Sequence, residues 1–408
     1  KEMFLKHDSA FSSRRVPDSF RTLGHDKVSV IWNPVGPRWR NLRKISTIQL
    51  FTNQRLYASQ GLRKKKVDEL VQFVKDCCER GLAIDIGKAV STTILNLLSN
   101  TFFSMDLSSY DSSTAQEFHD LASNILLEGA RPNVSDFFPF IRLFDLQGAR
   151  RRTKHYFLKM RAIFERIIAE RMKDQTGTED DVLDTLLKLL KENELSLLEI
   201  KHFLIDLFIA GTDTSSITLE WAITELLRHP EKMAKAQTEI DEVLGNDRSR
   251  SIQESDVSKL PYVQAIIKET LRLHPPAPFL VPHRANKDVE LCGYYVPKNT
   301  TIWINVWSMG RDPRIWADAE SFTPENFLGS EIDMKVRNFE FIPFGAGRRI
   351  CPGMPLAYRM MHLMLATLLH RFNWKLDNEL NPKDIDMEGK FGITLQKAQP
   401  LQVIPILR

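Results

Sequence analysis

One cysteine lies in a stretch whose residue types suit the binding of a metal or a large cation, FIPFGAGRRICPGMPLAYRMM, residues 341–361. Gly345 and Gly347 can adopt positive φ and let the backbone approach a ligand closely. A Pro-Gly step follows Cys351 and leads into an apolar pattern with helical spacing. Cys351 therefore stands at the start of a predicted helix, where free N–H groups and the helix dipole favour a thiolate. The two adjacent arginines supply groups that pair with anions.

A second candidate site lies in the middle of the longest predicted helix. Ser196 opens the capping box SLLE, and apolar periodicity continues to Pro230, a length of roughly 50 Å at about 1.5 Å per residue. The centre of this helix, AGTDTSS, contains poor helix formers; Ala210 and Thr214 share one face, with Asp213 beside them. We expect a local distortion here that serves function. The alternative is a notch of small residues where another helix crosses.

Three shorter patterns have both a functional and a purely structural interpretation. Trp39 and Arg43 are four residues apart, so they could bind one anion together, or form a half-buried indole beside a solvated guanidinium. Glu269 and Arg272, in IIKETLRLHPP, fit a surface ion pair of little energetic value. His283 follows a proline-stiffened segment, and a lone histidine there is more often a surface residue than a ligand.

The composition excludes several classes of protein. The chain has 408 residues, 43% of them hydrophobic, and a net charge of +4, so it can bury a large core but is too weakly basic to indicate nucleic-acid binding. The four cysteines show no spacing typical of a zinc site or a disulfide framework, which indicates a reducing compartment. No apolar run reaches the roughly 20 residues needed to span a bilayer. Because the chain does not begin with Met, we expect an N-terminal membrane anchor to be missing from it.

Helical periodicity dominates the first two-thirds of the sequence, as in the apolar stripe of Leu183, Leu186, Leu187 and Leu190. Strand-like segments gather late. DVELCGYYVPKNTTIWINVW predicts a short hairpin around its Pro-Lys-Asn turn, and GITLQKAQPLQVIPIL near the end is also strand-like. No linker or internal repeat divides the chain. We therefore predict a mainly α protein, with residues 1–408 forming a single large helical domain with small attached β-sheets.

Taken in order, these motifs resemble those of the cytochrome P450 family, the haem-thiolate monooxygenases. The long-helix motif, the Glu-x-x-Arg pair and the Trp-x-x-x-Arg pair all match, so the resemblance extends over essentially the whole chain. It implies the cytochrome P450 fold and haem b (iron protoporphyrin IX) as the cofactor. The most specific match is the run Phe344-x-x-Gly347-x-Arg349-x-Cys351-x-Gly353, which is similar to the haem-binding loop of that family.

The resemblance assigns roles to residues on both faces of the haem. Cys351 would be the proximal iron ligand and the metal-binding residue, as a thiolate, which favours cleavage of the O–O bond. On the other face, Thr214 would hold oxygen or water, and Asp213 would connect that site to solvent protons. The other residues expected to contact the cofactor are Trp39, Arg43, His283 and Arg349 at the propionates, together with Phe344, Gly345, Gly353 and Ala210.

One position departs from the family pattern. The family usually has Pro-Glu-Arg-Phe before the cysteine loop, whereas FTPENF places Asn326 where Arg is expected. That Arg normally completes a buried network with a Glu and an Arg at the positions of Glu269 and Arg272. The resemblance thus makes these two a buried structural pair and not catalysts. An amide at 326 can donate hydrogen bonds but carries no charge, so the third member of the network is weakened.

The nearest likeness within the family is the plant microsomal branch that hydroxylates terpenoids, through KHDSAFSSRR, FIPFGAGRR and KFGITLQKAQPL. We expect an abietane diterpene olefin as substrate (miltiradiene oxidised to ferruginol), with a geraniol-type monoterpenol as the alternative. Asp206 either binds a substrate hydroxyl or is a solvated helix residue. Phe391 is expected above the haem, opposite Val281. The expected substrate contacts are Asp206, Leu207, Ala210, Gly211, Phe279, Leu280, Val281, Phe391 and Ile393.

The resemblance also implies partners and a location. These are NADPH-cytochrome P450 reductase, O2 and a small apolar substrate, with no nucleic acid, for a monomer on the cytosolic face of the endoplasmic reticulum membrane. We expect the reductase to dock at Arg40, Lys44, the RKKK run at 63–66, and Arg348. Two rival functions are a haem-thiolate isomerase or dehydratase and a haem protein without turnover. The acid–threonine pair of the long helix argues against the isomerase.

Overall fold

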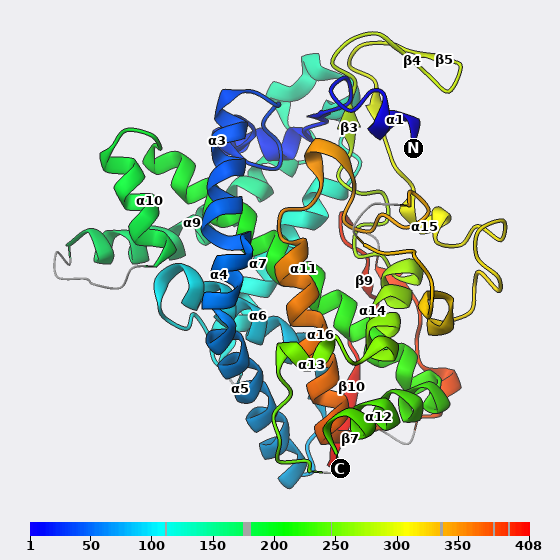
Figure 1. Ribbon diagram of the computed structural model, residues 1–408. Coiled ribbons are helices and arrows are strands. Elements are labelled where there is room, and N and C mark those ends of the chain that lie inside the picture. Colours follow the sequence, from blue (N-terminus) through cyan, green and yellow to red (C-terminus); the bar gives the residue numbers. More distant parts are fainter. Residues whose placement is uncertain (111, 174–180, 246, 335–337, 378–379, 391) are drawn as a thin grey trace.

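Helices make up most of this protein and enclose one large apolar core (Figure 1). The computed structural model describes residues 1–110, 112–173, 181–245, 247–334, 338–377, 380–390 and 392–408. The predicted mainly α class with small sheets is confirmed. Within the described residues, no helix is both long enough and apolar enough to cross a membrane.

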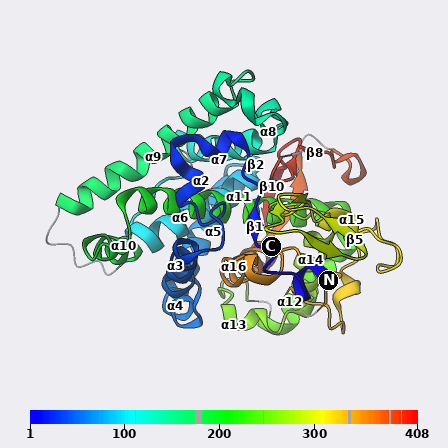
Figure 2. The same ribbon diagram turned by 90° about the horizontal axis from the view of Figure 1, so that it is seen from above.

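The longer helices surround a central helix, α11, which packs against α6, α9, α14 and α16. Figure 2 shows α9 and α10 on one side of the molecule and α15 with strand β5 on the other. The longer helices are α3 (Pro37–Ser46), α5 (Gln60–Glu79), α6 (Ile86–Phe103), α7 (Ser113–Ala130), α9 (Ala149–Lys173), α10 (Val182–Lys191), α11 (Leu197–Arg228), α12 (Pro230–Leu244), α14 (Pro261–Leu273) and α16 (Met354–Arg371). The short ones are α1 (Glu2–Leu5), α2 (His25–Val28), α4 (Asn53–Ala58), α8 (Val134–Phe137), α13 (Glu254–Val257) and α15 (Val306–Met309).

In the part of the chain that the structure describes, four small antiparallel sheets have the strand orders β1-β3-β6, β2-β10-β7, β4-β5 and β8-β9. The strands are β1 (Ser13–Arg14), β2 (Ile84–Asp85), β3 (His283–Arg284), β4 (Val289–Leu291), β5 (Tyr294–Val296), β6 (Thr301–Ile302), β7 (Phe372–Leu376), β8 (Gly389–Lys390), β9 (Gln396–Lys397) and β10 (Gln402–Leu407). The strands predicted near the C-terminus are therefore present.

The hairpin predicted in 288–307 is present, but its turn lies elsewhere. Strands β4 and β5 are joined by Cys292 and Gly293, whose φ angles of 51° and 81° suit a tight two-residue turn. The Pro-Lys-Asn sequence comes after β5, and β6 then pairs with β3 instead. The prediction chose the commoner turn residues and overlooked the glycine that tolerates positive φ.

Helix α11 runs without interruption through its predicted weak centre, so the expected distortion is absent. Its Ser196 capping box is confirmed, with reciprocal bonds between Ser196 and Glu199. The hydroxyl groups have partners within the helix because they bond to carbonyls one turn earlier, as Thr214 Oγ1 donates to Ala210 O at 2.8 Å. The alternative interpretation, a notch of small residues where another helix crosses, holds at Gly211, where α6 packs against α11. A Cβ there would lie 2.9 Å from Leu98 Cδ1 on α6.

A buried ion pair joins α14 to the segment before the cysteine loop. Arg272 Nη2 lies 2.6 Å from Glu269 Oε1, and both side chains are fully buried. Arg272 also donates to the carbonyls of Ala319 and Ser321, and the Thr323 N–H donates to Glu269 at 2.6 Å. The surface-pair interpretation is therefore wrong, because neither charge reaches solvent.

Asn326 adds little to this network. Burial raises the pKa of Glu269, and Arg272, Thr323 and Asn326 oppose that shift, Arg272 most strongly. The Asn326 Nδ2 atom is itself buried and has no well-formed hydrogen bond in the described part of the chain. The amide therefore contacts the pair without replacing a third charge.

Replacing Glu269 with Gln should destabilise the protein by about 3–5 kcal/mol, because the Arg272 charge would be buried without its partner. The measurement is the free energy of unfolding from urea titration. Glu79→Gln is the matched control, since its Lys75 partner is 3.8 Å away and both side chains are largely exposed. Equal stability of the two variants would show that the buried pair does not hold this region together.

Candidate active site

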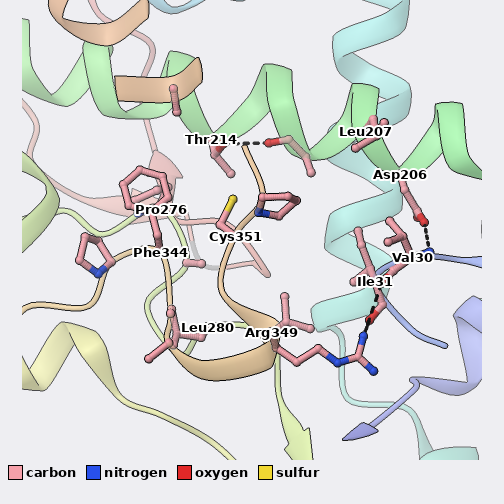
Figure 3. Close-up of a pocket in the computed structure, with 18 of the residues that line it drawn as sticks. Val30, Ile31, Asp206, Leu207, Thr214, Pro276, Leu280, Phe344, Arg349 and Cys351 are labelled. Carbon is pink, nitrogen blue, oxygen red and sulfur yellow. Dashed lines mark hydrogen bonds between the residues drawn. The ribbon is translucent and has the colours of Figure 1, made fainter. Parts of the chain in front are cut away.

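A cavity of about 240 Å³ lies between α11 and the cysteine loop. Its other walls come from α3, α14, α16, strands β1 and β3, the segment 30–31, and the segment that joins α14 to β3. Figure 3 shows Thr214 on α11 above the Cys351 sulfur, with Phe344 and Leu280 beside the loop. Most of the lining is apolar, so the cavity suits a ligand with a large apolar body.

The cysteine loop presents the Cys351 sulfur to this cavity. Gly345 and Gly347 have φ angles of 73° and 67°, and the Cys351 N–H donates to Phe344 O at 2.9 Å. The side chain opens onto the cavity, although the surrounding protein separates it from bulk water.

The electrostatics of Cys351 differ from the sequence expectation. Burial raises the pKa of the Cys351 thiol and outweighs the backbone N–H groups of Gly353 and Met354 and the charge of Arg43. The start of α16 therefore favours a thiolate but does not by itself produce one. A metal ion bound to the sulfur would supply the missing stabilisation, because a coordinating thiol is deprotonated.

Three guanidinium groups lie close enough together in the cavity wall to repel one another. Arg14 and Arg349 are buried and Arg43 is half-buried, and all three line the cavity. Burial, together with the charges of Arg349 and Arg43, lowers the pKa of Arg14 to about 9. Burial, helped by the charge of Arg43, likewise lowers the pKa of Arg349 to about 9. In the described residues no carboxylate forms an ion pair with any of them. Such a cluster requires an anion.

Backbone groups hold these arginines in place while leaving their charge uncompensated. Arg349 donates to the carbonyls of Ser12 and Asn33, and its guanidinium lies 4.5 Å over the Trp39 ring. Arg43 donates to the carbonyl of Ile350. Arg14, on β1, is a site residue that sequence analysis missed; it belongs to the opening SSRR run, but only its strand pairing with His283 brings it to the cavity.

The residues around the cavity fit haem b. A lone sulfur can hold the iron, apolar walls can cover the macrocycle, and the uncompensated guanidinium cluster can pair with the two propionates. No group of three His, Cys, Asp or Glu side chains in the described residues could form another kind of metal site. The donor set is thus that of a haem held by one cysteine.

Trp39 and His283 line the cavity, but their N–H groups have partners within the protein. Trp39 Nε1 donates to Val30 O at 3.0 Å, and His283 Nδ1 lies 2.7 Å from the Phe11 carbonyl, to which it must donate. Burial, helped by the charge of Arg14, lowers the pKa of His283 to about 3. Their predicted contact with an anion stays a prediction.

The predicted acid–threonine pair lies on two sides of α11. The Thr214 side chain faces the cavity (Figure 3). Asp213 is buried outside the cavity lining, and its Oδ1 accepts a hydrogen bond from Gln396 Nε2 at 2.9 Å. Burial raises the pKa of Asp213, opposed chiefly by the charge of His119. Only the hydroxyl of the pair therefore meets the cavity directly.

Of the two predicted roles of Asp206, burial excludes one, and the contact with a substrate hydroxyl stays a prediction for a residue at the cavity wall. It is 3% exposed, so it is not a solvated helix residue. Its Oδ2 accepts hydrogen bonds from Ser29 Oγ at 2.7 Å and from the Val30 N–H at 2.8 Å, while His25 Nε2 lies 3.3 Å from Oδ1. Asp206 therefore anchors the segment that places Val30 and Ile31 in the cavity wall (Figure 3).

The other predicted contacts divide into two groups. Gly211 faces α6, Phe279 packs edge-on against Trp303 at 5.8 Å, and Ile393 lies against the Gly129 region of α7, so none of them lines the cavity. Phe391 lies outside the described residues. Those at the cavity wall are Leu207, Ala210, Leu280, Val281, Phe344 and Gly345. Sequence analysis missed Val30, Ile31, Ser215, Thr218, Leu271, Pro276 and Ala277.

Comparison with known proteins agrees with this geometry. The family model "Cytochrome P450" matches residues 1–404. Cytochrome P450 76AD1 of Beta vulgaris is 54% identical over all of this chain and 83% of its own length. Geraniol 8-hydroxylase of Catharanthus roseus is 48% identical over 99% of this chain and 83% of its own length. A zebrafish cytochrome P450 solved with abiraterone superposes with a TM-score of 0.81 at 27% identity, covering all of this chain and 90% of that one. The chain therefore belongs to the cytochrome P450 family of monooxygenases, which bind haem b through a cysteine thiolate, and Cys351 is the cysteine that lines the cavity.

Proposed function

We propose that this enzyme hydroxylates a neutral plant terpenoid, using O2 and electrons from NADPH-cytochrome P450 reductase. The observation that carries the proposal is the polarity of the cavity. Asp206 is the only carboxylate among its described lining residues, and Ser29 and Val30 already occupy one of its oxygens. A charged substrate would therefore lack a free partner on the α11 side, whereas an apolar one fits.

The 48% sequence identity to the geraniol 8-hydroxylase of Catharanthus roseus makes a geraniol-type alcohol our first choice of substrate. The comparisons give no support to the abietane diterpene that the sequence analysis placed first. Cytochrome P450 76AD1, the more similar of the two relatives, has a name that states no substrate. We therefore propose a substrate class and not a single compound: neutral terpenoids with a mostly apolar body.

In the proposed arrangement, Cys351 holds the iron, and Arg14, Arg43 and Arg349 hold the two propionates. When bound in this way, haem activates O2 and transfers one oxygen atom to a C–H bond. The Thr214 hydroxyl donates to Ala210 O, so its lone pairs remain available to accept a hydrogen bond from water. Asp213, on the other side of α11, stores a proton for that water. An isomerase or dehydratase would need neither group.

We also propose that the enzyme contacts the endoplasmic reticulum membrane from the cytosolic face. The support is an exposed apolar surface on α8 and the following 3₁₀ turn (Pro139–Phe144), in which Leu143 is 90% exposed. A patch of this kind on a folded protein marks an interaction site. Its large apolar side chains are Phe137, Phe138, Phe140, Leu143 and Phe144.

The proposed docking surface for the reductase is smaller than the sequence indicated. Arg63 and Lys66 are buried; Arg63 pairs with Glu254, and Lys66 lies 2.9 Å from Glu69. They face the core because they follow the apolar stripe of α5, and neutralising them would damage the fold. The basic residues that remain exposed are Arg40, Lys44, Lys65 and Arg348, the last paired with Asp8 at 2.9 Å.

Changing Arg40 and Lys44 together to Glu should slow reduction of the iron by the reductase several-fold, because opposite charges steer the encounter of the two proteins. Substrate-binding spectra should stay the same. Stopped-flow reduction measures the rate, and raising the salt to 1 M, where the screening length is about 3 Å, should lower the wild-type rate. Lys298→Glu, an exposed charge near the β4–β5 hairpin, is the control. A double variant as fast as this control would exclude α3 from the docking surface.

Turnover tests the substrate class. Purified enzyme with reductase, NADPH and O2 should convert geraniol to a hydroxylated product, identified by mass spectrometry, with smaller yields from sesquiterpenes and miltiradiene. Cys351→Ala should give none, because the sulfur that holds the iron is lost. Oxidation of a charged amine or amino acid, with every terpenoid left unchanged, would contradict the proposed function while leaving the family assignment intact.

A further inference from the structure

A chain of polar side chains leads from the buried Asp213 carboxylate to the surface of α7. Gln396 Nε2 donates to Asp213 Oδ1 at 2.9 Å and to Ser123 Oγ at 3.2 Å. Ser123 Oγ lies 3.5 Å from His119 Nε2, one turn earlier on α7. His119 is half-buried, so it meets both this chain and solvent. In the described residues, the second oxygen of Asp213 has no well-formed hydrogen bond.

A small hollow accompanies this chain. It has a volume of about 40 Å³ and lies between α7 and the segment around β9. The site is polar on several sides, which is what an ordered water requires, and a water occupies about 30 Å³ in the liquid. Ser123, Thr394 and Gln396 are among its lining residues. Gln396 is also the residue that donates to the Asp213 carboxylate.

We propose that His119 is the residue through which protons enter this enzyme on their way to Asp213, with Ser123, Gln396 and a water in the hollow positioned between them. The inference rests on the proposed role of Asp213 and names the route that supplies it. The Gln396 amide only donates hydrogen bonds to its two partners here, so it positions the route and does not carry the proton.

Each transfer balances. An N–H bond of the His119 imidazolium breaks as an O–H bond forms on Ser123 Oγ, whose own proton passes to a water in the hollow. That water in turn releases one of its protons to a carboxylate oxygen of Asp213. Solvent then returns a proton to the imidazole. One turnover consumes the substrate C–H compound, O2, NADPH and one proton, and yields the alcohol, water and NADP⁺. Histidine suits the entry position because its charge changes in the physiological pH range.

Burial makes Asp213 a ready acceptor, since it raises the pKa of the carboxyl. The charged groups that act on this carboxyl are His119 on α7 and, on its own helix, Glu220. Burial raises the pKa of Glu220 to about 7, and its Oε1 accepts the Leu401 N–H at 2.9 Å. Glu220 is therefore the competing proton source, but no hydrogen-bonded side chain in the described residues joins it to Asp213.

The test compares His119→Gln with His155→Gln, in which an exposed histidine on α9 is changed in the same way. His119→Gln should lower the yield of alcohol per NADPH by about tenfold, less than the ~10²–10⁴-fold typical of a direct acid–base group because water can partly replace it. Hydrogen peroxide should appear instead. Oxidation driven by added hydrogen peroxide, which brings its own protons, should match that of wild type, and so should the haem spectrum.

A second readout needs no turnover. In the diamagnetic ferrous carbon-monoxide form, the ring nitrogen-15 NMR signals of His119 should move toward those of neutral imidazole when Asp213 is changed to Asn. Glu220→Gln should leave them in place. Unmoved His119 signals in Asp213→Asn, or coupling in His119→Gln equal to that in His155→Gln, would overturn the proposal. Loss of both NADPH-driven and peroxide-driven oxidation in His119→Gln would also overturn it, because the substitution would then have damaged the structure and not the proton supply. Failure of the proposed function would look different, as a wild-type enzyme inactive on every terpenoid.

Discussion

Three guanidinium groups that have no carboxylate partner among the described residues are the constraint around which this structure is arranged. Burial and mutual repulsion lower the pKa of Arg14, and burial lowers that of Arg349 and Arg43. Such a cluster is unfavourable unless an anion joins it. The three residues come from β1, α3 and the cysteine loop, so an anion bound between them would connect parts of the chain that are more than 300 residues apart. Cofactor binding and folding should therefore stabilise each other.

The central helix separates two environments that the chemistry needs to keep apart. Its cavity side presents Ala210 and the Thr214 hydroxyl among apolar walls. Its other side holds Asp213 within polar contacts to α7 and the C-terminal strands. One residue of rotation along a regular helix, about 100°, is enough for this division because an α-helix has 3.6 residues per turn. An undistorted α11 is thus what the proposed proton supply requires.

Sequence reasoning found the features that short-range spacing encodes. The Ser196 cap, the Cys351 loop and the Glu269–Arg272 pair all depend on neighbours within a few residues. It missed Asp206 as an anchor because the partner Ser29 lies 177 residues away in sequence. Arg63 and Lys66 could have been recognised as inward-facing, since they fall on the apolar stripe of α5. The prediction instead treated the whole RKKK run as exposed because all four of its residues are basic.

The central claim is that Cys351 and the arginine cluster hold a single haem, the sulfur through the iron and the guanidinium groups through the propionates. A crystal structure of the purified, haem-loaded enzyme tests it most directly. The expected result is Cys351 Sγ bound to iron, with both propionates within hydrogen-bonding distance of Arg14, Arg43 or Arg349. Propionates directed away from all three arginines, or iron bound to Cys77, Cys78 or Cys292, would contradict it.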